Sequence, residues 1–323
     1  MHAYTRRSLT LALLTLASTL PLVPAYAAQK EITIDFATYN PLSLVIKELG
    51  WLEQEFARDD VAIRWVQSLG SNKALEFLNA GSIDFGSTAG AAALIGRING
   101  NPIKAVGVYS RPEWTALVGR ADSTFASPAD LKGKSIAVTR GTDPHIFLIR
   151  ALAEARLTEK DVRIVLLQHP DGKAALLRGD VDAWAGLDPL MAQAEIEDRA
   201  RLFYRNPAAN SWGILNVREE FARQNPKTVK RVLAVYEKAR QWALAHPAEL
   251  QAILVKATKL PDAVVAKQLE RTDLSNKEIT SATRETILLA GRALQQASVI
   301  KPEVDVQAVL SQLIDTQYAL ATD

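Results

Sequence analysis

The sequence contains no cysteine and only four histidines among its 323 residues. Without cysteine the chain can form no disulfide, no thiolate metal site and no cysteine nucleophile. One of the four histidines, His2, lies next to the N-terminus, which leaves three for the body of the chain. We therefore predict no metal site and no cofactor.

The chain also lacks a large charge of either sign. Its 38 Lys and Arg residues nearly balance 36 Asp and Glu residues, and the net charge of +2 predicts no general attraction to nucleic acid or membranes. Apolar residues make up 48% and charged residues 23% of the sequence, an ordinary globular composition. The length is sufficient for two domains with real cores.

The N-terminus has the pattern of an export signal. Arg6-Arg7 precede an apolar run from Leu9 to Leu20, and Ala25-Tyr26-Ala27 form an A-x-A cleavage site. We predict cleavage after Ala27, so that residues 1–27 are removed. Thr5 to Leu9 also resembles a twin-arginine signal, but we favour the Sec route, in which the two arginines only supply charge. The mature protein is then exported, to the periplasm if the source is bacterial.

Strand-like and helix-like segments alternate along the mature chain. Alternating apolar residues predict strands near 32–36, 61–66 and 103–109, with amphipathic helices between them. This alternation predicts an α/β fold with mostly parallel sheets. We expect two lobes joined by two crossings, with a hinge and a ligand cleft. Lobe 1 would comprise residues 28–116 and 213–323, including a helical C-terminal part, and lobe 2 residues 117–212.

Two turns rich in serine and glycine each precede a helix. The first runs from Ser68 to Ser71, and the second, Gly86 to Gly90, follows a short strand at Ile83–Phe85. Free backbone N–H groups at helix N-termini attract anions. Alternatively, Ser71 and Thr88 only cap their helices.

The two predicted lobes share a local pattern. A helix ends in glycine and a strand follows at residues 80–86 and again at 178–184, which places Asp84 and Asp182 at corresponding positions. An internal duplication or repeated turn chemistry would explain this, and we favour the latter.

Three segments of the chain resemble a known family. Residues 75–86, 130–138 and 178–184 are similar to the substrate-binding proteins of ABC importers for aliphatic sulfonates and related sulfur sources. The resemblance covers nearly the whole mature chain and implies the type 2 periplasmic binding protein fold. Residues 39–43 and 67–73 are most similar to members that serve alkanesulfonate or sulfate-ester uptake.

The resemblance also implies a function. We expect a binding protein, and no enzyme, that captures an organosulfur anion and delivers it to an ABC transporter permease in the inner membrane for use as a sulfur source. We expect a monomer without nucleic-acid partners. Taurine, nitrate, bicarbonate and thiamine-precursor pyrimidines are alternative ligands on the same scaffold. An enzyme on this scaffold is a weaker alternative, because no cysteine, Gly-x-Ser-x-Gly elbow or Ser-His-Asp order is present.

The resemblance places ligand contacts in the loops that follow the strands. A sulfonate is a permanent monoanion with three acceptor oxygens, so hydroxyls and backbone N–H groups at helix N-termini suit it. The candidate ligand residues are Tyr39, Asn40, Ser68, Gly70, Ser71, Ser87, Thr88 and Ala89 in the first lobe, and Thr139, Arg140, Gly141, Thr142, His145, Trp184 and Asp188 in the second.

Four of these candidates have competing roles. Arg140 either clamps the anion or pairs with a surface carboxylate. His145 either donates to the ligand or packs in its lobe, and Trp184 either touches the ligand or belongs to the strand core. Asp188 would hold Arg140 or cap the helix that begins at Pro189, which is our preferred interpretation.

The aromatic residues near the expected crossings are assigned to packing. Trp114 and Trp212 lie close to the two crossings, so we expect them to pack at the hinge. Tyr39 directly follows the first strand and is the better candidate for an aromatic wall of the cleft.

Overall fold

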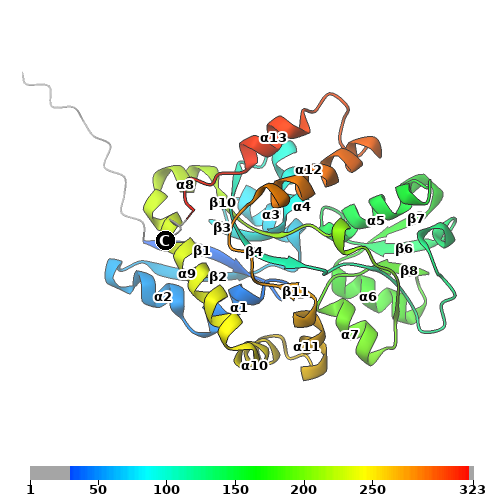
Figure 1. Ribbon diagram of the computed structural model, residues 1–323, viewed down its shortest axis with the longest axis horizontal. Helices are drawn as coiled ribbons and strands as arrows, with labels where there is room; N and C mark the ends of the chain where they lie inside the picture. Colours follow the sequence, from blue (N-terminus) through cyan, green and yellow to red (C-terminus); the bar gives the residue numbers. More distant parts are fainter. Residues whose placement is uncertain (1–29, 320–323) are drawn as a thin grey trace, which may run out of the picture.

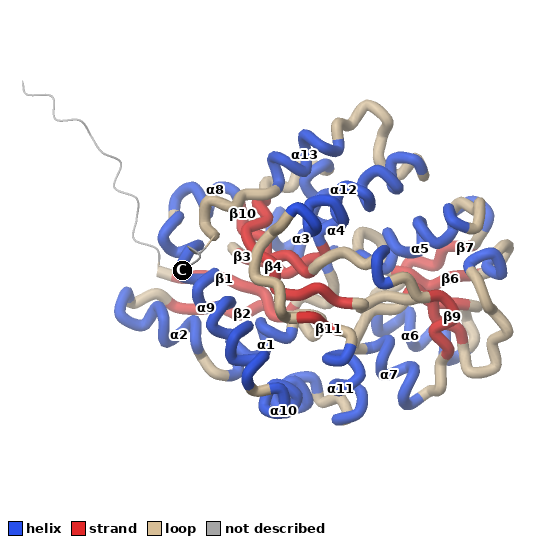
Figure 2. The backbone as a smooth tube through the Cα atoms, in the orientation of Figure 1, coloured by secondary structure: helices blue, strands red, loops and turns tan. Residues whose placement is uncertain are grey.

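The computed structural model describes residues 30–319, so the predicted signal peptide lies outside the described residues. Two α/β lobes stand side by side, each built on its own sheet (Figure 1). Helices cover both sheets, and loops connect the lobes (Figure 2). Within residues 30–319, no helix combines the length and the apolar character needed to cross a membrane.

The sheet of the first lobe has six strands in the order β11-β4-β10-β3-β1-β2. β1 pairs in parallel with β2 and β3, whereas β10 runs antiparallel between β3 and β4. The sheet is therefore mixed, because β10 brings the chain back from the second lobe. Its strands are β1 (Glu31–Phe36), β2 (Ala62–Gln67), β3 (Phe85–Ala89), β4 (Ile103–Pro112), β10 (Gly213–Arg218) and β11 (Thr272–Asp273).

Helices from both ends of the described chain pack around this sheet. Asn40 caps α1 by accepting a hydrogen bond from the Ser43 N–H, and Pro41 occupies the first helical turn. The helices are α1 (Pro41–Glu48), α2 (Trp51–Phe56), α3 (Ser71–Asn79), α4 (Gly90–Ile98), α8 (Glu219–Gln224), α9 (Pro226–Ala245), α10 (Pro247–Thr258), α11 (Asp262–Glu270), α12 (Ser281–Gln296) and α13 (Val306–Leu313).

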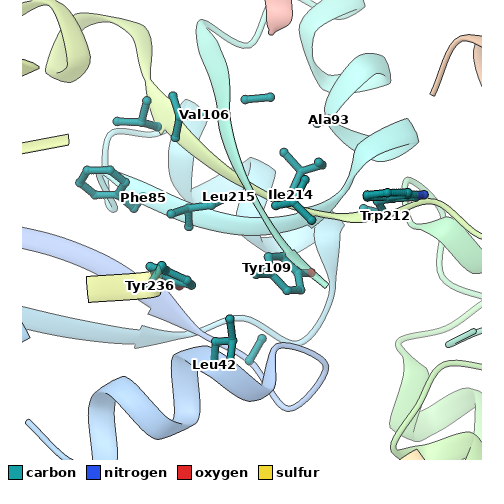
Figure 3. Packing of buried hydrophobic residues seen from close by; sticks show 14 of the residues in the cluster. Leu42, Phe85, Ala93, Val106, Tyr109, Trp212, Ile214, Leu215 and Tyr236 are labelled. Atoms are coloured by element: carbon teal, nitrogen blue, oxygen red, sulfur yellow. The ribbon is translucent and has the colours of Figure 1, made fainter. Parts of the chain in front are cut away.

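The first lobe encloses a large apolar core. Strand residues such as Phe85 and Leu215 pack against helix residues such as Leu42 and Tyr236, and Figure 3 shows these side chains together. Burial of this many apolar side chains is the main stabilising term for the lobe.

The sheet of the second lobe has five strands in the order β7-β6-β8-β5-β9. β6 pairs in parallel with β7 and β8, and β5 is antiparallel to β8 and β9. The elements are β5 (Leu117–Gly119), β6 (Ser135–Val138), α5 (Asp143–Glu154), β7 (Arg163–Leu166), α6 (His169–Arg178), β8 (Ala183–Ala185), α7 (Leu190–Glu197) and β9 (Arg201–Tyr204).

The prediction of a turn at Gly86–Gly90 is wrong, because most of this segment forms a strand. β3 runs from Phe85 to Ala89, and α4 begins at Gly90. Residues 85–89 are fully buried and pair antiparallel with 213–217 of β10. This pairing with a distant segment overrides the turn propensity of Gly86 and Ser87.

An aspartate holds the start of a strand in the same way in each lobe. Oδ2 of Asp84 accepts from the Thr33 N–H at 2.8 Å and from its hydroxyl at 2.9 Å. Oδ2 of Asp182 accepts from the Ser135 N–H at 2.8 Å and from its hydroxyl at 2.7 Å. The similarity between residues 80–86 and 178–184 therefore reflects the same hydrogen-bonding arrangement in both lobes.

Two crossings and two helices connect the lobes. In the crossings, the Thr115 N–H donates to Oδ1 of Asn210 at 2.9 Å, which joins the segment after β4 to the segment before β10. α11 contacts α7 and α12 contacts α5, so helices of the C-terminal segment touch the second lobe at two places (Figure 1).

Candidate functional site

Two cavities lie between the lobes and share Tyr39 and Leu187 in their walls. The inner one measures about 10 Å³ and the outer one about 160 Å³. Typical small-molecule pockets measure about 300–1,000 Å³, so entry of an organic ligand requires the lobes to separate. The inner cavity is lined by Tyr39, Ser71, Trp114, Thr142, Asp143, Pro144 and Leu187. The outer cavity is lined by Thr38, Tyr39, Gln67, Leu69, His169, Pro170, Leu187, Asp188, Pro189, Leu190, Thr258 and Leu260.

Helix N-termini from both lobes meet at the inner cavity. Ser71 is the first residue of α3, and Thr142 is the N-cap residue of α5. The Ser71 hydroxyl accepts from the Ala89 N–H at 3.0 Å, so it joins the start of α3 to the end of β3 and does not cap its own helix. The Thr142 hydroxyl donates to the Thr139 carbonyl at 2.6 Å. The positive ends of two helix dipoles therefore face the same small space.

Asp143 is a buried carboxyl in the wall of the inner cavity. Its Oδ2 accepts from Nε1 of Trp114 at 2.8 Å and from the Ser211 N–H at 2.9 Å. Burial raises the pKa of this carboxyl, and the two hydrogen bonds partly offset the rise. Because Trp114 and Ser211 lie on the two crossings, Asp143 joins α5 to the hinge.

An aromatic wall borders the inner cavity. The rings of Tyr39 and Trp114 meet edge to face, with centroids 6.0 Å apart. The Tyr39 hydroxyl donates to the Ser87 carbonyl at 3.0 Å, which holds the ring in place. Leu187 adds an apolar contact from the second lobe.

A polar network beneath this wall supports the first lobe's loops. The N–H and the hydroxyl of Ser87 both donate to the buried carboxyl of Asp35, at 2.9 and 2.8 Å. Nδ2 of Asn40 donates to the Ser87 hydroxyl at 2.8 Å. Burial raises the pKa of Asp35 to about 6, against the effect of the Ser87 hydrogen bonds.

An ion pair between Asp188 and Arg271 joins the two lobes beside the outer cavity. Nη1 of Arg271, which follows α11, lies 3.5 Å from Oδ2 of Asp188, and Nη2 of Arg271 bonds to Glu195 of α7. The Ala192 N–H donates to Oδ1 of Asp188 at 2.8 Å, so Asp188 also caps the start of α7. Burial raises the pKa of Asp188 to about 7, although Arg271 favours the charged form.

His169 faces the first lobe from the start of α6. Its side chain lines the outer cavity, and a Cβ atom at Gly70 would lie 3.0 Å from Nε2 of the ring. Burial lowers the pKa of His169 to about 3, so the ring is neutral at physiological pH. The absence of a side chain at Gly70 makes room for this ring.

The structure brings only some of the predicted ligand residues to the cavities. Tyr39, Ser71, Thr142 and Asp188 line them. A second group lies in β3 and in the adjoining loops and lines neither cavity; the side chains of Asn40, Ser87, Thr88 and Thr139 serve hydrogen bonds within their own lobe. This group is Asn40, Ser68, Gly70, Ser87, Thr88, Ala89, Thr139 and Gly141.

Arg140, His145 and Trp184 lie away from both cavities. The Arg140 side chain is 56% exposed and lies 3.7 Å from Glu159, and Nε2 of His145 lies 3.1 Å from the same carboxylate. Both basic groups are therefore directed to a carboxylate of their own lobe, and the His145 hydrogen bond lowers the pKa of Glu159. Trp184 is fully buried in β8, and its ring fills the space beside Gly172 of α6.

Several residues of the cavity walls were not among the predicted ligand residues. Asp143, Pro144 and Leu187 had no recognisable motif, and Trp114 was assigned to hinge packing alone. His169 was also missed, although a histidine followed by proline at a helix start is a visible feature. Within residues 30–319, no group of three or more potential metal ligands occurs.

A further cavity of about 290 Å³ lies within the first lobe. It is bounded by β4, β10, α9 and the segments around Lys277 and Thr316, and it shares no residue with the two interlobe cavities. A ligand there would not contact both lobes. The interlobe cavities are therefore the better candidates for a site that changes the lobe arrangement.

Comparisons with known proteins agree with this architecture. Residues 43–250 match the model of the NMT1/THI5-like family. A protein of Escherichia coli (strain K12) that is named for aliphatic sulfonate binding is 29% identical over 250 residues, which cover 77% of this chain and 78% of that protein.

Solved structures show the same fold. The alkanesulfonate-binding protein SsuA from Xanthomonas axonopodis pv. citri, bound to MOPS, matches with a TM-score of 0.80 at 24% identity, over 90% of this chain and all of that one. The periplasmic aliphatic sulphonate binding protein SsuA from Escherichia coli matches with a TM-score of 0.76 at 24% identity, over 91% and 94% of the two chains. The chain thus has the type 2 periplasmic binding protein fold.

Proposed function

The chain belongs to the NMT1/THI5-like family, and we propose that it is the solute-binding component of an ABC importer for organosulfur anions. The ligand is an alkanesulfonate or a sulfate ester, taken up as a sulfur source. The observation that carries this proposal is the similarity to a protein named for aliphatic sulfonate binding over 77% of the chain.

The chemistry of the cleft supports an anionic ligand with an apolar part. The first turns of α3 and α5 direct backbone N–H groups toward the interlobe space. Tyr39, Trp114 and Leu187 provide an apolar wall for an organic tail.

The two carboxyl groups of the cleft favour the outer cavity for the sulfo group. Asp143, in the inner cavity, has no ion-pair partner within residues 30–319, so it opposes a nearby anion. The charge of Asp188, in the outer cavity, is partly offset by Arg271, which also pairs with Glu195. The sulfo group therefore binds beside the loop from Ser68 to Ser71 and His169.

We also propose a location and a transport role for the protein. The mature protein acts in the periplasm after cleavage behind Ala27, and residues 28–116 with 213–323 form one lobe and 117–212 the other. It acts as a monomer, without catalysis, and delivers its ligand to an inner-membrane permease. Ligand contacts from both lobes favour the closed state, which the permease then recognises.

A thermal-shift screen of the mature protein tests the ligand class. The panel contains ethanesulfonate, hexanesulfonate, taurine, hexyl sulfate, inorganic sulfate, nitrate and bicarbonate. A ligand at one hundred times its Kd adds about 2.7 kcal/mol of stability, which raises the Tm by roughly a few degrees in a protein of this size. We expect shifts with organic sulfonates or sulfate esters; shifts with nitrate or bicarbonate alone would refute the proposed ligand class.

A further inference from the structure

His169 is a buried histidine whose two ring nitrogens have no hydrogen-bond partner in the structure. Its side chain is only 1% exposed. The other histidines of the described chain differ, because His145 bonds to Glu159 and Nδ1 of His246 bonds to the Trp242 carbonyl. A buried polar group without a hydrogen-bond partner destabilises the folded state, so an imidazole in this condition calls for a functional explanation.

The position of His169 connects the two lobes. It is the first residue of α6 in the second lobe, and its ring lies against Gly70, in the loop before α3 of the first lobe. Oδ1 of Asn72, in the first turn of α3, is also buried without a hydrogen-bond partner. Like Nε2 of His169, it lies about 3 Å from where a Cβ atom at Gly70 would be, so an unpartnered polar atom from each lobe lies beside Gly70.

The protonation state of the His169 ring determines which ligand atoms it can bind. Because burial keeps the ring neutral, one nitrogen carries a hydrogen and the other is an acceptor. Asp188 lines the same cavity, and its carboxyl lies 3.5 Å from Arg271. Because the pKa of Asp188 is about 7, the charge on this side of the cavity changes between pH 6 and pH 8, whereas the His169 ring stays neutral over that range. The neutral ring offers an anion a directional hydrogen bond from its N–H.

We propose that His169 is a specificity-determining ligand residue, whose ring N–H donates to an oxygen of the bound sulfo group when the lobes close. This inference rests on the proposed function, since it assumes an organosulfur anion in the cleft. The loop at Gly70 contributes backbone N–H groups from the opposite side. Both lobes then contact the ligand through the oxygens of its sulfo group.

Two substitutions separate the hydrogen bond from the packing of the ring. His169→Phe keeps a ring of similar size without a donor, whereas His169→Asn keeps a donor in a smaller side chain. His246→Phe is the control, because His246 lies outside the cleft and stacks on Trp242. The titrant is whichever of ethanesulfonate, hexanesulfonate and taurine wild-type protein binds most tightly, and Kd is measured by isothermal titration calorimetry.

We expect His169→Phe to raise Kd at least tenfold, His169→Asn to raise it less, and His246→Phe to change it less than twofold. A Kd for His169→Phe within twofold of wild type would overturn the role of His169 and leave the proposed function intact. If wild-type protein binds none of the three sulfonates and no hexyl sulfate, the proposed function itself fails; if it binds hexyl sulfate alone, the same variants are titrated with that ester.

A measurement on wild-type protein keeps the proposal testable if the variants do not fold. The ring nitrogens of His169 are followed by nitrogen-15 NMR during titration with the same sulfonate. We expect their signals to shift on binding while those of His246 stay fixed. Unchanged His169 signals at saturation would overturn the proposal.

Discussion

Nε1 of Trp114 donates a hydrogen bond to Oδ2 of Asp143 at 2.8 Å, and this contact links the first crossing to α5. The same oxygen accepts from the Ser211 N–H on the second crossing. One carboxylate oxygen therefore holds both crossings against the helix whose N-terminus faces the cleft.

Removal of the Asp143 carboxyl is expected to destabilise the protein. Asp143→Ala loses two buried hydrogen bonds and leaves two donors unsatisfied, so the free energy of unfolding should fall by about 3 kcal/mol. Asp143→Asn keeps an acceptor oxygen and should lose less. Denaturant unfolding measures both. Asp122→Ala, at an exposed carboxylate, should stay within about 0.5 kcal/mol of wild type, and an equally small loss for Asp143→Ala would contradict the hinge role.

Asp188 is expected to make the protein less stable as the pH rises. Its pKa is about 7 in the folded protein, against the ordinary aspartate value of 3.8 in the unfolded chain, so between these pH values the folded state holds a proton that the unfolded chain has released. The contribution of Asp188 to stability therefore falls as the pH rises from 5 to 8. Comparing the Tm of wild type and Asp188→Asn across this range isolates the effect, because other titrating groups are common to both. We expect the wild-type Tm to decline more steeply, and parallel curves would refute the shifted pKa.

Arg271 is expected to favour the closed arrangement of the lobes. Arg271→Gln removes the ion pairs to Asp188 and Glu195 of the second lobe, which leaves a buried carboxylate without its cation. We expect a larger radius of gyration by small-angle X-ray scattering and a severalfold weaker ligand affinity. Lys267→Gln is the control, since Lys267 pairs within its own helix with Glu270. Identical scattering for the two variants would argue against an interlobe contact that matters in solution.

Arg140 is expected to contribute little to ligand affinity. Its guanidinium is largely exposed and pairs with Glu159, and exposed pairs of this kind are worth about 0–1 kcal/mol. Arg140→Ala should therefore change Kd less than twofold by calorimetry. A tenfold loss would restore the clamp that the sequence suggested and would mean that the side chain reorients on ligand binding.

Local sequence patterns predicted the elements whose contacts are close in the chain. The alternating residues at 32–36 lie in β1, and the helix α1 follows that strand, as the alternation of strands and helices predicted. β3 was misassigned because its strand state depends on β10, more than one hundred residues later. Propensity alone cannot report such a pairing.

The site was harder to predict than the fold for the same reason. The roles of His145 and Arg140 depend on Glu159, and that of Asp188 depends on Arg271. His169 meets Gly70 only because the two lobes face each other. These relationships arise from tertiary packing, which no motif in the chain encodes.

The most direct test of the account compares a sulfonate with its carboxylate counterpart. Isothermal titration calorimetry of residues 28–323 would measure Kd for ethanesulfonate, hexanesulfonate, taurine and hexyl sulfate, and for propionate and heptanoate as the carboxylate analogues of the two alkanesulfonates. We expect at least one sulfonate or hexyl sulfate to bind, and an alkanesulfonate that binds to have a Kd at least tenfold tighter than its carboxylate analogue. Equal or tighter binding of the carboxylates, or no binding of any of the three sulfonates and of hexyl sulfate, would contradict the proposed function.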